Sequence, residues 1–140
     1  MPDGLKQMLV DTAREKLLPL EDQVDLIDDE ADIVPGIRAI EAKGHTPGHM
    51  VVAVGSGLKQ LLYISDTVLH PLHLEYPEWH TDFYDYNVGQ AAESKQRVFD
   101  WAAAEGALVL AFHFYPFPSL GHVTKKERGW KWQPIAVGHR

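Results

Sequence analysis

Gly44-His45-Thr46-Pro47-Gly48-His49 is the stretch on which the interpretation of this sequence depends. Two histidines lie four positions apart. The proline and glycines around them are incompatible with a regular helix, because proline fixes φ and has no amide donor. We therefore predict a rigid, sharply turned loop with a histidine at each end. Such a histidine is typical of a metal ligand or a proton carrier, but the pattern also fits a turn whose histidines only hydrogen-bond to backbone.

Segments with a strand pattern flank this loop and recur along the chain. Apolar and polar residues alternate immediately before and after the loop, and a glycine-rich turn joins the second of these runs to a third, as in a β-hairpin. A later run is continuously apolar, which is typical of a strand buried on both faces. The predicted strands are residues 23–27, 37–42, 50–54, 58–64, 107–111, 123–124 and 130–132.

Two segments show helical spacing of their apolar residues. Residues 6–18 read as a short amphipathic helix, and residues 87–105 as the clearest helix, with Gly106 suited to its end. The segment between 68 and 86 is long, irregular and rich in His, Pro and aromatic residues, which in a compact domain usually indicates function. We predict one α+β domain, with an N-terminal helix in residues 1–20 and a sheet-and-helix module in residues 23–134.

Composition restricts the function classes. The chain has 140 residues, a formal net charge of −7 and no cysteine. The acidic balance argues against nucleic acid and anionic membranes as partners, because both require a basic surface. Without cysteine, any transition-metal site must use His, Asp and Glu. No apolar run suits a membrane span or a signal peptide, so we expect a cytoplasmic protein.

Three polar residues follow predicted strands. His49 lies at the end of the loop described above, Asp66 follows the strand at 58–64, and His113 follows the strand at 107–111. Strand ends gather at one edge of a sheet, where loops converge on a rigid support. An Asp and two His are suitable donors for a divalent ion, although a lone Asp after a strand is more often a turn residue. We predict these three as a metal site.

The same residues carry a family resemblance. His45-Thr46-Pro47-Gly48-His49, then Tyr63-Ile64-Ser65-Asp66, then His113-Phe114 resemble, in order and spacing, the second half of metallo-β-lactamase-fold hydrolases. The branch that holds methyl parathion hydrolase and related lactonases is the most similar. The resemblance covers residues 34–123. It implies an αββα sandwich, of which this chain resembles the C-terminal half: a mostly antiparallel sheet with packing helices.

The resemblance also implies roles for individual residues. His49 would be the third imidazole ligand of one metal, Asp66 would bridge two metals, and His113 would complete the second; these three are the expected catalytic residues. His45 would support the loop behind the ligands. Two zinc ions, or other divalent metals, would activate a water that attacks a small-molecule substrate of the complete enzyme, an ester, lactone or phosphotriester.

One family feature does not occur in this sequence. The His-x-His-x-Asp-His motif that supplies four further ligands is absent, and no histidine precedes His45. Two protein ligands per metal are fewer than the three of a typical catalytic zinc. We therefore expect an incomplete hydrolase that is inactive alone, and either a homo-oligomer or a missing N-terminal half. The alternatives are a non-catalytic interaction domain and the partner-dependent half of a split hydrolase.

Residues outside the ligand set form an expected substrate pocket. His70 lies shortly after Asp66, and Phe114 and Tyr115 follow His113, so we assign these three to the pocket wall. Their aromatic rings suit apolar esters, but they also fit a cluster that packs a loop onto the domain. His122 is expected to be a structural histidine.

Overall fold

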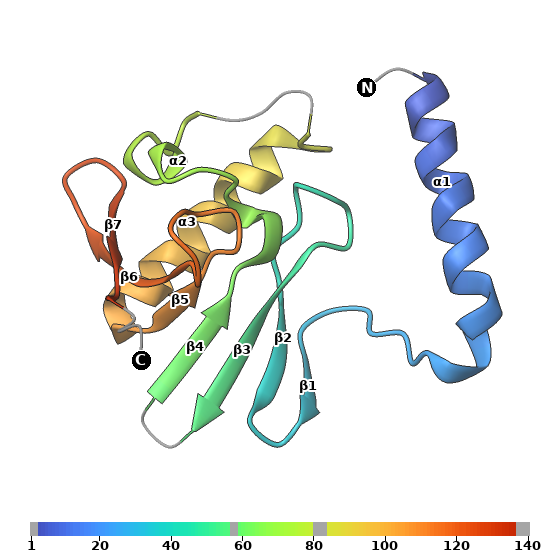
Figure 1. Cartoon of the computed structure of the whole chain (residues 1–140), viewed down its shortest axis with the longest axis horizontal. Coiled ribbons are helices and arrows are strands. Elements are labelled where there is room, and N and C mark those ends of the chain that lie inside the picture. Colours follow the sequence, from blue (N-terminus) through green and yellow to red (C-terminus); the bar gives the residue numbers. More distant parts are fainter. Residues whose placement is uncertain (1–2, 57–58, 80–83, 137–140) are drawn as a thin grey trace.

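The computed structural model describes residues 3–56, 59–79 and 84–136, and it contains a seven-stranded sheet (Figure 1). The strands neighbour each other in chain order, and every pair is antiparallel except β4 and β5, which are parallel. A parallel pair needs a crossover, and here the helix α3 supplies it. The strands are β1 (Ala31–Val34), β2 (Ile37–Glu41), β3 (Met50–Ser56), β4 (Lys59–Tyr63), β5 (Leu108–Leu110), β6 (Leu120–Lys125) and β7 (Trp130–Pro134).

The helices differ in length and in how they begin and end. The longest is α3, which starts at an Asn87 cap whose side chain accepts from the Gln90 amide, and ends at Gly106 with φ of 59°. These are the cap residues that a helix start and end favour. The helical segments are α1 (Asp3–Leu17), η1 (Leu18–Gln23), η2 (Ser65–Thr67), α2 (Leu72–Glu75) and α3 (Val88–Glu105).

One face of the sheet packs against α3, and we call it the covered face. Its strands contribute alternate apolar residues to a single core, in which α3 supplies Val98, Phe99 and Ala102. Phe99 and Trp130 are completely buried, with ring centroids 5.7 Å apart. The strand residues of the covered face are Ile40, Val51, Leu62, Val109 and Val123.

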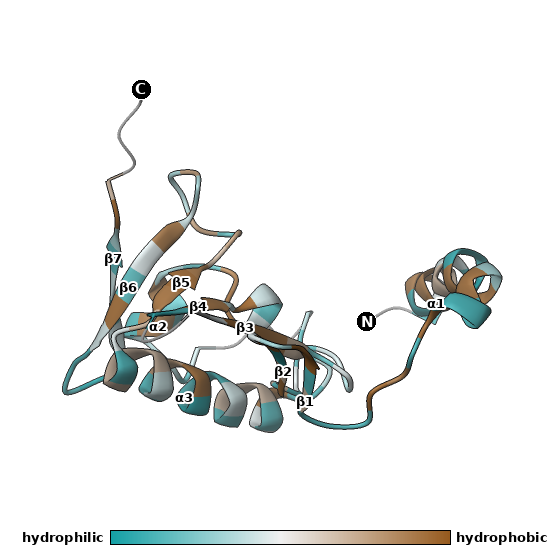
Figure 2. Cartoon of the chain, turned by 90° about the horizontal axis from the view of Figure 1, so that it is seen from below, coloured by the Kyte–Doolittle hydropathy of each residue, from teal (hydrophilic) through white to brown (hydrophobic). Residues whose placement is uncertain are grey.

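The opposite face carries the intervening residues, and we call it the open face. Figure 2 shows α3 beneath the sheet and no helix of the described chain above it. Val54 retains 37% of its exposure there. The sheet thus buries one apolar face and leaves the other partly in water.

The N-terminal helix stands apart from the sheet. Figures 1 and 2 show α1 beyond the β1 edge, connected by an extended segment. None of its residues is buried, and Met8 and Leu9 are about half exposed. No described helix is long and apolar enough to cross a membrane.

The structure confirms the α+β class and most of the predicted elements. The strand predicted at residues 23–27 is not formed: η1 ends at Gln23, and residues 24–27 are extended without a sheet partner. Alternation of apolar and polar residues favours a strand only where a neighbouring strand can accept its hydrogen bonds. The first strand instead lies at Ala31–Val34, for which the sequence predicted no strand.

Candidate metal site

Three chain segments meet at one end of the sheet, which we call the site end. They are the loop between β2 and β3, the turn η2 after β4, and the loop after β5 (Figure 1). Because β4 and β5 are parallel neighbours, their ends lie side by side. Asp66 and His113 therefore meet although 47 residues separate them.

The β2–β3 loop is held tightly against the start of α3. Gly44 has φ of 135°, and a Cβ there would overlap the backbone of Ala91. The Asn87 amide donates to the Gly44 carbonyl at 2.9 Å, and the Ser94 hydroxyl to the Lys43 carbonyl at 2.6 Å. Only glycine tolerates this backbone conformation and this close approach. The loop is thus sharply turned, as the sequence predicted, and these contacts hold it against α3.

His49 is a buried residue with both ring nitrogens bonded to backbone. Its Nδ1 donates to the Ala42 carbonyl at 2.9 Å, and its Nε2 accepts from the Asp66 amide at 3.0 Å. The side chain is only 7% exposed, and burial lowers its pKa, although the bond to Ala42 opposes this. His49 therefore ties the β2–β3 loop to the turn that carries Asp66.

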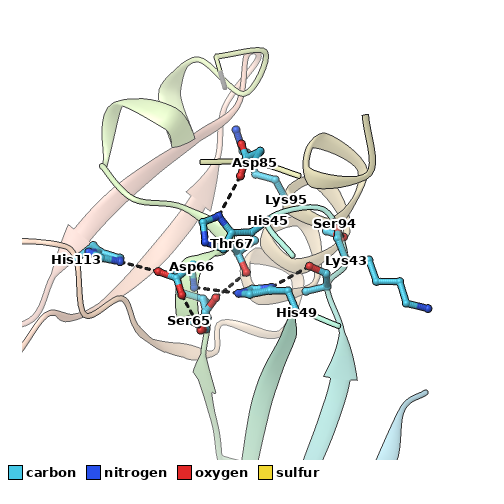
Figure 3. Close-up of polar contacts among 12 residues, drawn as sticks. Lys43, His45, His49, Ser65, Asp66, Thr67, Asp85, Ser94, Lys95 and His113 are labelled. Carbon is cyan, nitrogen blue, oxygen red and sulfur yellow. Dashed lines mark hydrogen bonds and ion pairs between the residues drawn. The ribbon is translucent and has the colours of Figure 1, made fainter. Parts of the chain in front are cut away.

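His45 has different surroundings. Its Nδ1 lies 3.1 Å from Oδ1 of Asp85, and the two side chains are 19% and 15% exposed. The carboxylate accepts, so Nδ1 is the donor in this pair, and Nε2 has the lone pair when the ring is neutral. Within the described chain no hydrogen bond to this Nε2 is formed, and Figure 3 shows the ring on the same side as Asp66. A carboxylate behind an imidazole is the usual support of a metal-bound histidine.

Asp66 lies between the histidine loop and the β5 loop. Its Oδ1 accepts from Nε2 of His113 at 2.8 Å, and the two side chains are 32% and 36% exposed (Figure 3). The preceding Ser65 has φ of 47°, unusual for a residue other than glycine, and its hydroxyl donates weakly to Oδ2 at 3.4 Å. Such backbone strain is often found at functional sites.

The donor chemistry suits a divalent cation, but the donor number is low. Imidazole nitrogens and a carboxylate are the ligands that zinc takes when thiolates are absent. Among residues 3–56, 59–79 and 84–136, however, no three His, Asp or Glu side chains converge on one point. If two ions were bound, each would have at most two of these donors. Asp66 would be shared by both ions, with His45 or His49 as the second donor of one and His113 as the second donor of the other.

The predicted pocket residues have separate environments. Phe114 is 3% exposed and packs edge-to-face on Trp132 at 5.1 Å, so it belongs to the core, not to a pocket wall. Tyr115 is 90% exposed. His70 is exposed, and its Nδ1 accepts from the Leu72 amide at 3.2 Å at the start of α2. Phe114 reaches the core from the turn after β5, where its amide donates to the Ala111 carbonyl at 2.7 Å.

Two residues near the site were not singled out from the sequence. Asp85 lies in the irregular segment before α3, where no periodicity marks it. Lys95 is 5% exposed, and its ammonium donates to the carbonyls of Pro77 at 3.1 Å and Trp79 at 2.9 Å. Burial lowers the pKa of Lys95, and Asp85 opposes that shift. A lysine in the middle of an amphipathic helix normally faces solvent, so only the fold reveals this one.

His122 is a structural histidine, as predicted from the sequence. Its Nδ1 donates to the Ala107 carbonyl at 3.0 Å. Its role is therefore to connect β6 with the start of β5.

Solved structures resemble this chain over almost its whole length. AidC, a dizinc quorum-quenching lactonase, superposes with a TM-score of 0.87 and 24% identity, over 99% of this chain and 46% of AidC. AbOPH, a hydrolase in the beta lactamase superfamily, superposes with a TM-score of 0.79 and 24% identity, over 99% of this chain and 49% of AbOPH. The chain has a metallo-β-lactamase-like fold. A probable metal-dependent hydrolase from Staphylococcus aureus also matches, with a TM-score of 0.65 and 19% identity. The match covers 84% of this chain and 42% of the hydrolase chain.

The fold prediction is thereby confirmed, and the comparisons show how much of the fold this chain spans. The chain spans less than half the length of these three structures. No sequence profile of a protein family and no curated protein sequence matches the chain. Similarity at this level of identity establishes the fold, whereas the activity has to be argued from the site.

Proposed function

We propose that this chain is part of a metal-dependent hydrolase that cleaves an ester, lactone or phosphotriester. The observation that supports this most is the Asp66 carboxylate at the site end, with His113 2.8 Å away on one side and the histidine loop on the other. Solved structures with this fold include a lactonase and other hydrolases, and this similarity supports the proposal.

In this proposal His45, not His49, is the imidazole ligand of the loop. A ligand nitrogen needs a free lone pair and a partner that fixes the other nitrogen. His45 has both, through its Nδ1 bond to Asp85. His49 would have to give up the Asp66 amide and expose a ring that is 7% accessible. This assignment exchanges the roles that we predicted from the sequence for the two histidines.

Each residue then has a defined task. His45 and Asp66 would hold one zinc ion, and Asp66 and His113 the other, while Asp85 orients His45 and His49 positions the backbone of Asp66. Bound zinc would supply a Lewis acid and a water with a pKa near neutrality. The half-exposed Asp66 and His113 leave this end of the sheet open to a substrate.

Further ligands must come from outside this set of three donors. A catalytic zinc ordinarily has three protein ligands, and this set offers two per ion. We propose that a second polypeptide segment completes the site, and that the 140 residues alone have little hydrolytic activity.

Zinc titration of the purified chain tests the proposal. We expect zinc binding that His45→Ala and Asp66→Ala each weaken about tenfold or more, because losing one of two donors removes roughly half of the coordination. His122→Ala is the matched control, because that ring bonds to the Ala107 carbonyl away from the site. Ring NMR signals of His45 and His113 should shift on zinc addition.

Two results would contradict this proposal. Less than about a tenth of an equivalent of bound zinc at saturation would remove the metal function for this chain. Loss of zinc in His49→Ala with retention in His45→Ala, in variants that stay folded, would restore the original assignment of His49 as ligand.

A further inference from the structure

We propose that Lys95 is a positioning residue of the metal site, which holds Asp85 in place so that Asp85 can orient His45. The inference deepens the proposed function. It rests on that function only for the metal, because the state of the His45 ring can be measured without zinc. Lys95 itself forms no hydrogen bond with His45, Asp66 or His113 in the described chain.

Lys95 is buried although it lies in the middle of α3. The residue is 5% exposed, and its ammonium donates to two backbone carbonyls. Lysine is rarely buried to this extent, because the ammonium loses its hydration. An apolar residue of similar length would fill the same space without that cost. Packing alone therefore does not account for a lysine at this position.

The ammonium of Lys95 fastens the chain that follows α2 onto α3. The carbonyls of Pro77 and Trp79 accept from it at 3.1 Å and 2.9 Å. Trp79 is also stacked on Tyr76, with ring centroids 4.5 Å apart, and its amide donates to the Tyr76 carbonyl at 2.9 Å. A lysine ammonium has three donors, and these two carbonyls use two of them. The charge and one donor of Lys95 remain available to other groups nearby.

Asp85 lies between Lys95 and the histidine loop. Its carboxylate accepts from Nδ1 of His45, and the amide of the next residue, Tyr86, donates to the His45 carbonyl at 3.1 Å. Figure 3 shows the carboxylate of Asp85 with Lys95 on one side and the His45 ring on the other. Burial lowers the pKa of Lys95, and the Asp85 carboxylate opposes that shift, so the two charges interact.

A small cavity connects these groups with the site end. It has a volume of about 30 Å³, and its lining includes Lys95, Asp85, His73 and Asp66. This volume is similar to that of one water molecule, and a polar lining provides the partners that a buried water requires. Lys95 and the carboxylate that we propose to bridge the ions thus line the same space.

Coulomb attraction explains how Lys95 would act on His45. A cation beside a partly buried carboxylate attracts it more strongly than in water, because the local dielectric constant is lower. A carboxylate that is held in this way accepts a strong hydrogen bond from Nδ1 of His45. That bond sets the orientation of the ring and leaves Nε2 for the ion. Loss of the charge on Lys95 should therefore loosen His45 without touching it.

Nitrogen NMR of the histidine rings in the full chain, without metal, tests the positioning. The ¹⁵N shifts of the two ring nitrogens identify the tautomer, and about pH 8.5 is suitable because it lies about two units above the ordinary histidine pKa. We expect the His45 proton on Nδ1 in the wild type and a mixture of both tautomers in Lys95→Gln. Lys95→Arg retains the charge and should restore the Nδ1 proton. Lys131→Met, which removes an exposed lysine of β7, is the matched control and should not change His45.

Zinc titration tests whether Lys95 acts through Asp85. Asp85→Asn should raise the dissociation constant of zinc about tenfold or more, as expected for a group behind a metal ligand, and Lys95→Gln about three- to tenfold. In the Asp85→Asn background, Lys95→Gln should add less than about twofold, because its route to His45 is already lost. A Lys95→Gln effect of unchanged size in that background would overturn the proposed route.

Circular dichroism and urea unfolding establish that each variant is folded. If Lys95→Gln does not fold, Lys95→Met replaces it, because methionine fills a buried helix position without a charge. A lysine that only fastens the loop would lower the free energy of unfolding when it is replaced. It would leave the His45 tautomer and the zinc dissociation constant unchanged. That result in a folded variant would overturn the proposal.

The two proposals fail in different ways. A chain that binds no zinc but whose His45 tautomer depends on Lys95 supports the positioning and removes the metal function. A chain that binds zinc through His45 and Asp66 equally well in the wild type and in Lys95→Gln supports the metal function and overturns the role of Lys95.

Discussion

The two faces of the sheet have similar compositions and opposite environments. On the covered face, apolar residues pack against α3, the described polar groups are paired, and His49 is bonded at both nitrogens. On the open face, Val54, Leu61 and Tyr63 are half-buried or exposed, and the adjoining Asp66 and His113 reach solvent. The covered face is therefore packed within the chain, whereas the open face and the site beside it stay accessible.

This difference separates stability from function. Changes on the covered side should act mainly on folding, because its contacts are all intramolecular. Changes at Asp66 and His113, which adjoin the open face, should act on metal binding. The β2–β3 loop contains both kinds of residue, His49 bonded inward and His45 with a free nitrogen.

The largest effect is expected from a matched pair of leucines in β4. Leu62→Ala should lower the free energy of unfolding by about 3 kcal/mol, because the side chain is completely buried and leaves a cavity. Leu61→Ala, one residue earlier on the open face, should cost less than about 1 kcal/mol in the monomer. Urea unfolding at low protein concentration measures both. Equal costs would mean that the two faces do not differ in packing.

An intermediate effect is expected at the two histidines of the loop. His49→Ala should cost about 2 kcal/mol, because the Ala42 carbonyl and the Asp66 amide lose their partner in a buried site. His45→Ala should cost about 1 kcal/mol or less, since its one hydrogen bond is to a partly accessible carboxylate. Chemical denaturation of both variants without metal tests this order, which the opposite ranking would refute.

The smallest effect concerns pH. Burial lowers the pKa of His49 and of His73, the latter with contributions from Lys95 and His70. The unfolded chain, with histidine pKa near 6.5, then binds more protons than the folded one below that pH. Their contribution to stability is therefore full above about pH 6.5 and is lost as pH falls toward the lower folded pKa.

A variant isolates one of these two groups. His73→Gln should reduce the loss of stability between about pH 6.5 and 5, because it removes one of the two histidines whose pKa is lowered in the folded chain. Thermal unfolding across this pH range measures the slopes. A wild-type chain whose stability does not fall over this range would show that neither histidine is buried in its neutral form.

Local patterns predicted the parts of the fold that depend on neighbouring residues. Period-two alternation located the strands around the histidine loop, and the helical spacing of apolar residues with Gly106 at its end located α3, since both signals arise from nearby residues. The segment at 24–27 has a similar alternation but no strand beside it, and sequence alone could not show that. Phe114 was assigned to a pocket because the sequence shows that it follows His113 but does not show the direction of its side chain, which packs on Trp132.

The sequence by itself determined the rigid histidine loop, the α+β class, the donor types at the strand ends and the exclusion of thiolate chemistry. These follow from residue type and short spacing. Only the tertiary structure decided which histidine of the loop has a free nitrogen, because the partners Ala42, Asp66 and Asp85 come from three different segments. It also decided which sheet face is covered, since a single α3 can pack on only one side.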